Sequence, residues 1–306
     1  MTRPGAIITE RDREILRSLD EYRLLTTEQV QRLHFPSAQT TLRRLRRLET
    51  ERLVARQRSL ALATQAVTLT TRGAAVLRNG DDHAEAFRRA PGRPTRLPGE
   101  FFLRHTVAVN DFRIALKLDA CLRHDVELLG VVADAERSAA GPAVQPRAVL
   151  AESVAFEGER GERLAHVPDL AFGLRRDGRQ ALFLVEVDRG TEVIGDPKRG
   201  VGLFVRFYLR ALVAGGFRGL GARLGGQAGF KGFRVLVVTT SRARVEAIRD
   251  RLGTLPVDPE VAKKFIWLTT SEAVHSGRLL EHEWVSLDHR DEQRYVIAPH
   301  RMEGTS

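Results

Sequence analysis

The chain has 306 residues, of which 42% are hydrophobic and 29% are charged, and its formal net charge is +10. No run of residues is apolar for long enough to cross a bilayer, the first residues do not resemble a secretory leader, and the single cysteine, Cys121, excludes a disulfide framework and a cysteine-based zinc cluster. We therefore expect a cytoplasmic globular protein with room for two hydrophobic cores and a preference for a polyanionic partner.

Helix-start signals divide the first eighty residues. Thr9 and Thr26 each begin a capping-box-like segment, and Ser37 caps a third helix that runs to about residue 51. Pro36 ends the second, short helix. Two strands are expected over residues 53–58 and 66–70, followed by a helical turn. Three helices followed by two strands are the order of a winged helix-turn-helix, which we assign to residues 1–78.

The third helix of this domain has an apolar side and a basic side at about 100° per residue. The expected apolar side carries Leu42, Leu45 and Leu48. Between positions 37 and 78 the chain has nine arginines and two glutamates, a local excess of seven positive charges. This layout is typical of a recognition helix that contacts bases and phosphates. The alternatives are a solvated basic face and a protein-docking surface. The predicted DNA contacts are Gln39, Thr40, Arg43, Arg44, Arg46, Arg47, Arg58 and Arg72.

Residues 79–99 are polar and proline-rich and predict a linker. A second domain is expected over residues 100–290, with a tail over 291–306. Its predicted helices span about 101–124, 199–213, 242–252 and 271–275. Its predicted strands span about 127–133, 166–174, 181–188, 233–239 and 265–268. Apolar strands that alternate with helices indicate a mixed α/β sheet covered on both faces.

Three carboxylates fall at the ends of two predicted strands. Because side chains alternate along a strand, Glu186 and Asp188 share one face, and a hairpin of this length brings Asp169 near them. Convergent carboxylates at the end of a buried sheet can hold a divalent cation for phosphodiester chemistry. His166 could join such a site, although a hydrogen-bonded structural histidine is the expectation that we favour.

The order of elements in the second domain resembles the core of the PD-(D/E)xK restriction-endonuclease-like superfamily. A winged helix joined to such a core resembles the replication-relaxation family of plasmids and integrative elements. The resemblance covers about residues 8–275. The segments that carry it are Thr26-Thr27-Glu28-Gln29-Val30, Thr68-Leu69-Thr70-Thr71-Arg72-Gly73, His105 with Asn110-Asp111, Val167-Pro168-Asp169, Glu186-Val187-Asp188-Arg189-Gly190-Thr191-Glu192 and Val235-Leu236-Val237-Val238-Thr239.

The resemblance implies a role in plasmid replication or in the control of DNA topology. It also implies that Asp169 and Glu186 are metal ligands and that Asp188 stands where these nucleases usually have a lysine. That lysine activates the attacking water and neutralises charge on the phosphate, which an aspartate cannot do. Lys198 could replace it, because some members of the superfamily carry the lysine on the following helix.

These observations predict a DNA-binding protein of a mobile genetic element that acts in replication, relaxation or transfer, with a non-catalytic nuclease-like domain. One alternative is an active Mg²⁺-dependent endonuclease or nickase using Asp169, Glu186, Asp188 and Lys198. Another alternative is a winged-helix transcriptional regulator. The expected partner is double-stranded DNA, together with replication or transfer proteins of the element. No cofactor is expected unless the nuclease is active, no membrane partner is expected, and homodimerisation stays open.

Overall fold

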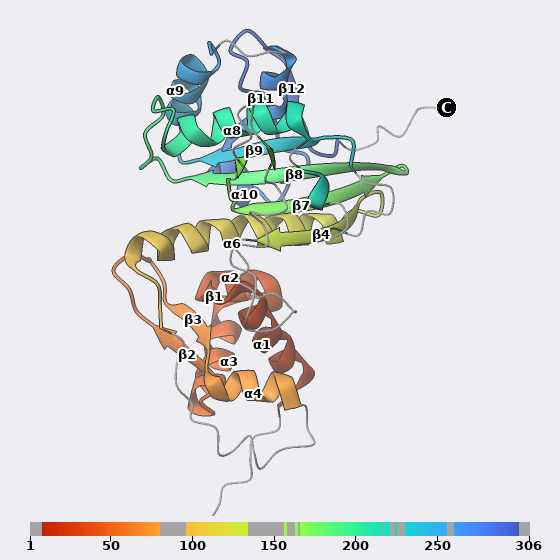
Figure 1. The fold of residues 1–306 in the computed structure, drawn as a ribbon. Coiled ribbons are helices and arrows are strands. Elements are labelled where there is room, and N and C mark those ends of the chain that lie inside the picture. Colours follow the sequence, from red (N-terminus) through yellow and green to blue (C-terminus); the bar gives the residue numbers. More distant parts are fainter. Residues whose placement is uncertain are drawn as a thin grey trace, which may run out of the picture. The chain divides into compact units, whose positions relative to one another are not determined.

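The chain divides into two compact units, residues 1–114 and 115–306, and the boundary lies inside helix α6 (Glu100–Cys121) (Figure 1). The sequence placed this whole helix in the second domain. The structure, a computed structural model, describes residues 8–79, 96–133, 156–157, 163–164, 166–215, 217–220, 224, 230–255 and 260–299. Residues 80–95 of the predicted linker, the loop predicted around 138–147 and residues 300–306 of the predicted tail lie outside this part.

The N-terminal unit combines helices with a small antiparallel sheet whose strand order is β1-β3-β2. Its helices, besides the first turns of α6, are α1 (Glu10–Tyr22), α2 (Thr27–His34), α3 (Ala38–Thr50) and α4 (Thr71–Asn79). Its strands are β1 (Leu24–Thr26), β2 (Val54–Gln57) and β3 (Ala66–Leu69). The sequence missed β1, a three-residue strand, because it pairs only with a strand about forty residues later and shows no alternation of its own.

The predicted helix starts are confirmed. Thr9 and Thr26 close capping boxes with Asp12 and Gln29, and the Ser37 side chain accepts a hydrogen bond from the backbone N–H of Thr40. These caps satisfy N–H groups that the first turn of a helix leaves without partners. The start of α3 is therefore fixed by local chemistry.

The first turns of α6 complete the N-terminal unit. Asn110 Nδ2 donates to the carbonyl oxygen of Leu24 at 2.8 Å, and Gln29 Nε2 donates to the carbonyl oxygen of Val107 at 2.9 Å. Leu103 also joins Leu24 in a small apolar cluster. Asn110 is buried, so its side-chain amide needs hydrogen-bond partners inside the protein. It donates to backbone carbonyl oxygens at the end of α1 and in β1.

The C-terminal unit is built on a seven-stranded mixed sheet in the order β12-β11-β10-β9-β8-β7-β4. Strands β8, β9 and β10 are parallel, and the other neighbouring pairs are antiparallel. The strands of this sheet are β4 (Glu127–Ala133), β7 (Leu170–Arg176), β8 (Arg179–Asp188), β9 (Phe233–Thr239), β10 (Ile266–Thr270), β11 (Trp284–Ser286) and β12 (Arg294–Tyr295). The remaining elements are the strand pair β5 (Phe156–Glu157) and β6 (Arg163–Leu164), the helices α8 (Gly200–Ala214), α9 (Arg242–Leu252) and α10 (Ser271–His275), and the 3-10 turns η1 (Arg218–Leu220) and η3 (Glu260–Phe265).

The sequence missed β11 and β12, which extend the sheet beyond β10. These strands are three and two residues long, and β12 lies within the predicted tail. Segments this short carry almost no periodic signal, so their pairing depends on the sheet that they join. In the sheet, β11 pairs with β12 in antiparallel orientation, with Trp284 opposite Tyr295.

The main core of this unit lies between one face of the sheet and helices α8 and α9. Leu182 and Leu184 of β8 contribute to it, together with Phe204 of α8 and Ile248 of α9. Because alternate residues of a strand share a face, the next two positions on that face are Glu186 and Asp188. The carboxylates of Glu186 and Asp188 therefore lie on the face of the sheet that α8 and α9 cover.

Candidate functional site

Helix α3 has a buried side and an outer face with polar and cationic side chains. Thr41, Leu45 and Leu48 are buried, whereas Leu42, which the sequence assigned to the core, is only partly buried. The exposed residues of its outer face are Gln39, Arg43, Arg46, Arg47 and Thr50. No ion pair is found for the three exposed arginines within the described residues. The cationic groups of this face are therefore exposed to solvent, without carboxylate partners in the described part of the chain.

The remaining predicted DNA contacts differ in their surroundings. Arg44 binds the buried Asp12 carboxylate through two nitrogens and donates to Thr9 Oγ1 at 2.8 Å, so it joins α3 to α1. Thr40 accepts a hydrogen bond from the Ser37 hydroxyl at the start of α3. Arg58 is exposed in the connection between β2 and β3, whereas Arg72 of α4 is partly buried. The exposed candidates are thus concentrated on α3 and in the β2–β3 connection.

In the C-terminal unit, Glu186 lies in a buried hydrogen-bonded cluster. The Tyr208 hydroxyl donates to Glu186 Oε1 at 2.5 Å, and His166 Nε2 lies 2.8 Å from the same oxygen. The His166 ring lies 5.6 Å from the Phe207 ring and also from the Tyr208 ring, measured between centroids. The sequence had predicted a hydrogen-bonded structural histidine here, and this geometry confirms the hydrogen bond.

Burial and the interactions with Glu186 shift the pKa values of this cluster. It raises the pKa of the Glu186 carboxyl and, together with the nearby carboxylate, raises the pKa of the Tyr208 hydroxyl well above its usual value. Burial alone would lower the pKa of His166, but the charge and hydrogen bond of Glu186 outweigh it, so this pKa is raised as well. All three groups therefore favour keeping their protons in the folded state.

Asp169 lies just before β7, beside the end of β8. Its backbone N–H donates to the carbonyl oxygen of Val185 at 3.0 Å, and its Oδ2 accepts from the backbone N–H of Val187 at 2.8 Å. Its charge contributes to the raised pKa of Glu186. The structure thus brings Asp169 and Glu186 together, as the hairpin predicts.

Asp188 is held by a different set of partners. Arg244 Nε of α9 donates to Asp188 Oδ2 at 2.8 Å, and the Thr239 hydroxyl donates to the same oxygen at 3.1 Å. The backbone N–H of Gly190 donates to Oδ1 at 2.9 Å. The Asp188 side chain is fully buried, so its charge is compensated inside the protein by the arginine.

Lys198 is exposed in the turn that precedes α8 rather than on the helix. Its backbone N–H donates to Asp196 Oδ1 at 2.9 Å, and no described contact brings its side chain to Asp169, Glu186 or Asp188. A lysine that acted on the phosphate would have to lie beside the carboxylates. The geometry therefore gives no support to Lys198 as the replacement lysine.

These donors do not fit a divalent cation as they are arranged. One Glu186 oxygen accepts from Tyr208 and lies against His166, and the Asp188 carboxylate is bound by a guanidinium group. Mg²⁺ requires several oxygen ligands that converge in octahedral geometry. Within the described residues, no group of three or more histidine, cysteine, aspartate or glutamate side chains is arranged to hold a metal ion.

The sequence missed Tyr208 and Arg244, the two residues that determine how the carboxylates are used. Tyr208 lies within an apolar helical run, where a tyrosine is unremarkable. Arg244 is one of several arginines on α9 and is 56 residues from Asp188. Only the tertiary fold brings these partners to the end of β8.

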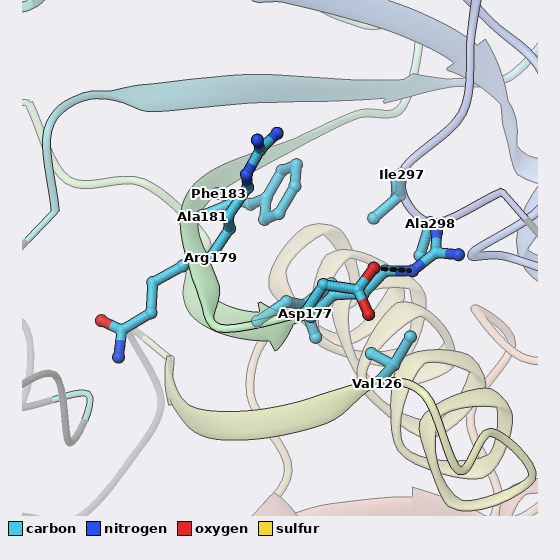
Figure 2. A pocket seen from close by; sticks show the side chains of 10 residues that line it. Val126, Asp177, Arg179, Ala181, Phe183, Ile297 and Ala298 are labelled. Carbon is cyan, nitrogen blue, oxygen red and sulfur yellow. Dashed lines mark ion pairs between the residues drawn. The ribbon is translucent and has the colours of Figure 1, made fainter.

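A hollow of about 580 Å³ lies at the opposite end of β8, away from the carboxylates (Figure 2). Val126, Ala181, Phe183 and Ile297 contribute apolar side chains to it. The dashed line in Figure 2 marks the ion pair in which Arg176 Nε lies 3.8 Å from an oxygen of the neighbouring Asp177. This hollow contains none of the predicted site residues.

The geometry defines a two-unit α+β protein with a cationic helix in the first unit and a buried carboxylate cluster in the second. A protein-family model described as Replication-relaxation matches residues 16–208, which is more than half of the chain. The chain belongs to the replication-relaxation family. No curated protein and no solved structure matched it. None of the helices in the described part of the chain has the length and apolarity needed to span a membrane.

Proposed function

We propose that this protein binds duplex DNA through α3 and acts in the replication, relaxation or transfer of a plasmid or integrative element. The observation that carries this proposal is the outer face of α3, where Arg43, Arg46 and Arg47 are exposed and have no acidic partner among the described residues. Membership of the replication-relaxation family supports a role connected with DNA.

The N-terminal unit would act as a winged helix-turn-helix. Its order of elements, with α3 followed by the β2–β3 hairpin, supports this assignment. In such domains a helix enters the major groove, where guanidinium groups bind guanine edges or phosphates. Arg43 and Arg47 are one helical turn apart, so both can face one groove. Arg58 in the β2–β3 connection would contact the adjacent backbone.

The C-terminal unit would be an endonuclease-like fold that does not cut DNA. The resemblance to nucleases implies that Asp188 stands where an active enzyme needs a positive side chain, and the nearby cation, Arg244, is engaged in neutralising Asp188. Arginine stays protonated in proteins, so Arg244 cannot serve as a base. We therefore propose that this unit serves binding or assembly.

Binding of duplex DNA by the full chain tests the proposal. The Arg43→Ala/Arg47→Ala variant should bind a labelled duplex more weakly than the native protein, because both side chains lie on the proposed contact face. Footprinting of the bound DNA in the host would separate an origin-binding protein from a transcriptional regulator. The regulator would protect its own promoter and leave the origin of the element unprotected.

A further inference from the structure

We propose that the solvent face of α8 is a second DNA-binding surface, which contacts the phosphate backbone of duplex DNA. This inference rests on the proposed DNA binding and extends it to the C-terminal unit. Arg206 and Arg210 are the only charged residues of α8, and both are exposed. They define what we call the α8 basic face, which also includes the exposed Leu203 and Val213.

The inner side of α8 packs into the hydrophobic core of the C-terminal unit. Phe204, Val205 and Tyr208 are buried against the sheet, and the Tyr208 hydroxyl binds Glu186. The helix is therefore fixed on its unit and presents the opposite side to solvent. At about 100° per residue, positions 203, 206, 210 and 213 fall on one narrow stripe.

The two arginines of this face have no compensating charge among the residues that the structure describes. No ion pair is found for either within the described residues, although other exposed arginines have one, such as Arg17 with Glu10 and Arg199 with Asp196. Like charges four residues apart on a helix repel each other and destabilise the helix. A bound polyanion would relieve this repulsion.

The same arrangement occurs on the proposed recognition helix. Arg43 and Arg47 are also four residues apart, and the acid of α3, Glu49, is engaged by Arg56 of β2, with 2.8 Å between Arg56 Nε and Glu49 Oε2. In each unit an exposed helix therefore carries an arginine pair with no ion pair among the described residues, and such a pair fits the repeating phosphates of a polyanion better than a small ligand. Contacts of arginine with phosphate oxygens carry no sequence information, so the α8 basic face should add affinity without specificity.

The test is the salt dependence of binding to a fluorescently labelled duplex of random sequence, with the full chain. Each phosphate contact contributes about 0.9 to the slope of log affinity against log salt. The Arg206→Ala/Arg210→Ala variant should bind more weakly, and its slope should be shallower by about 1.8. Arg206→Lys/Arg210→Lys keeps both charges and should keep most of the slope.

A matched control removes two exposed arginines from elsewhere in the same unit, Arg242→Ala/Arg278→Ala, and should bind like the native chain. If Arg206→Ala/Arg210→Ala has the affinity and slope of this control, the α8 inference is overturned and the α3 proposal is unaffected. If the α8 variant binds more weakly while Arg43→Ala/Arg47→Ala binds normally, the α3 proposal fails and the α8 inference stands. If the native chain does not bind duplex DNA, both are overturned.

Discussion

Arg244 Nε donates a hydrogen bond of 2.8 Å to Asp188 Oδ2, so α9 supplies the positive charge that neutralises a fully buried carboxylate at the end of β8. Arg244 Nη2 also donates to the carbonyl oxygen of Glu192 at 2.5 Å. This arginine therefore ties α9 both to β8 and to the segment that leads into α8. Asp188 and Arg244 therefore form a buried structural ion pair at the end of β8.

Asp188→Ala should destabilise the C-terminal unit. Removing one partner of a buried pair leaves the other charge uncompensated, which costs about 3 kcal/mol. Trp267 and Trp284, the two tryptophans of the chain, both lie in this unit, so urea unfolding followed by their fluorescence measures the change.

Glu127→Ala is the matched control for that measurement. It also removes a carboxylate bound to an arginine, but both members of the Glu127–Arg175 pair are solvent-accessible. Such pairs contribute at most about 1 kcal/mol. Equal losses of stability in the two variants would show that the Asp188–Arg244 pair has no special structural role.

The stability of the C-terminal unit should fall as the pH rises above 6.5, the ordinary pKa of histidine. The folded-state pKa of His166 is raised, so its contribution is fully present below the unfolded value and is lost as the pH rises through the folded value. The raised pKa of Glu186 acts in the same direction, and its loss of stabilisation begins above pH 4.5.

Urea unfolding at a series of pH values measures this dependence. His166→Gln should flatten it above 6.5, and an unchanged profile in that variant would refute the assignment.

Arg44→Ala should destabilise the N-terminal unit, because it leaves the Asp12 carboxylate buried without its cation. The expected loss is about 3 kcal/mol. Hydrogen–deuterium exchange of the α1 amides measures it within this unit, and Arg43→Ala, at the exposed neighbouring position, should leave exchange unchanged. Native exchange in Arg44→Ala together with weaker DNA binding would instead make Arg44 a DNA contact.

Supercoiled plasmid should remain intact when it is incubated with the native chain and Mg²⁺ or Mn²⁺. The physical reason is that Asp188 is bound by Arg244 and Glu186 is bonded to Tyr208 and lies against His166. Agarose gel electrophoresis measures conversion to the nicked form. Nicking that disappears in both Asp169→Ala and Glu186→Ala would establish an active nuclease and contradict the non-catalytic proposal.

Hydrophobic periodicity and helix-cap residues correctly predicted several helices and strands. The apolar run of β9 and the helix α9 have the predicted bounds, and the side-chain caps of Thr9, Thr26 and Ser37 start the helices as expected. Alternation along β8 correctly placed Glu186 and Asp188 on one face. These features depend on residues within a few positions of one another.

The partners of the carboxylates could not be predicted in this way. Tyr208 is 22 residues from Glu186, and Arg244 is 56 residues from Asp188, so neither contact follows from spacing along a helix or strand. The same limit applies to Arg44, whose partner Asp12 lies on another helix. The sequence indicates which residue types could form a site, whereas the packing of α8 and α9 determines whether they form hydrogen bonds with each other.

The most direct test of DNA binding through α3 is the salt-dependent affinity of Arg43→Ala/Arg47→Ala for duplex DNA. Its control is Arg17→Ala/Arg104→Ala, which removes the same charge from exposed positions of the same unit. We expect the affinity of the α3 variant for duplex DNA to be lower than that of this control by about tenfold or more. Its slope of log affinity against log salt should be shallower by about 1.8. The same affinity and slope in the two double variants would contradict the account.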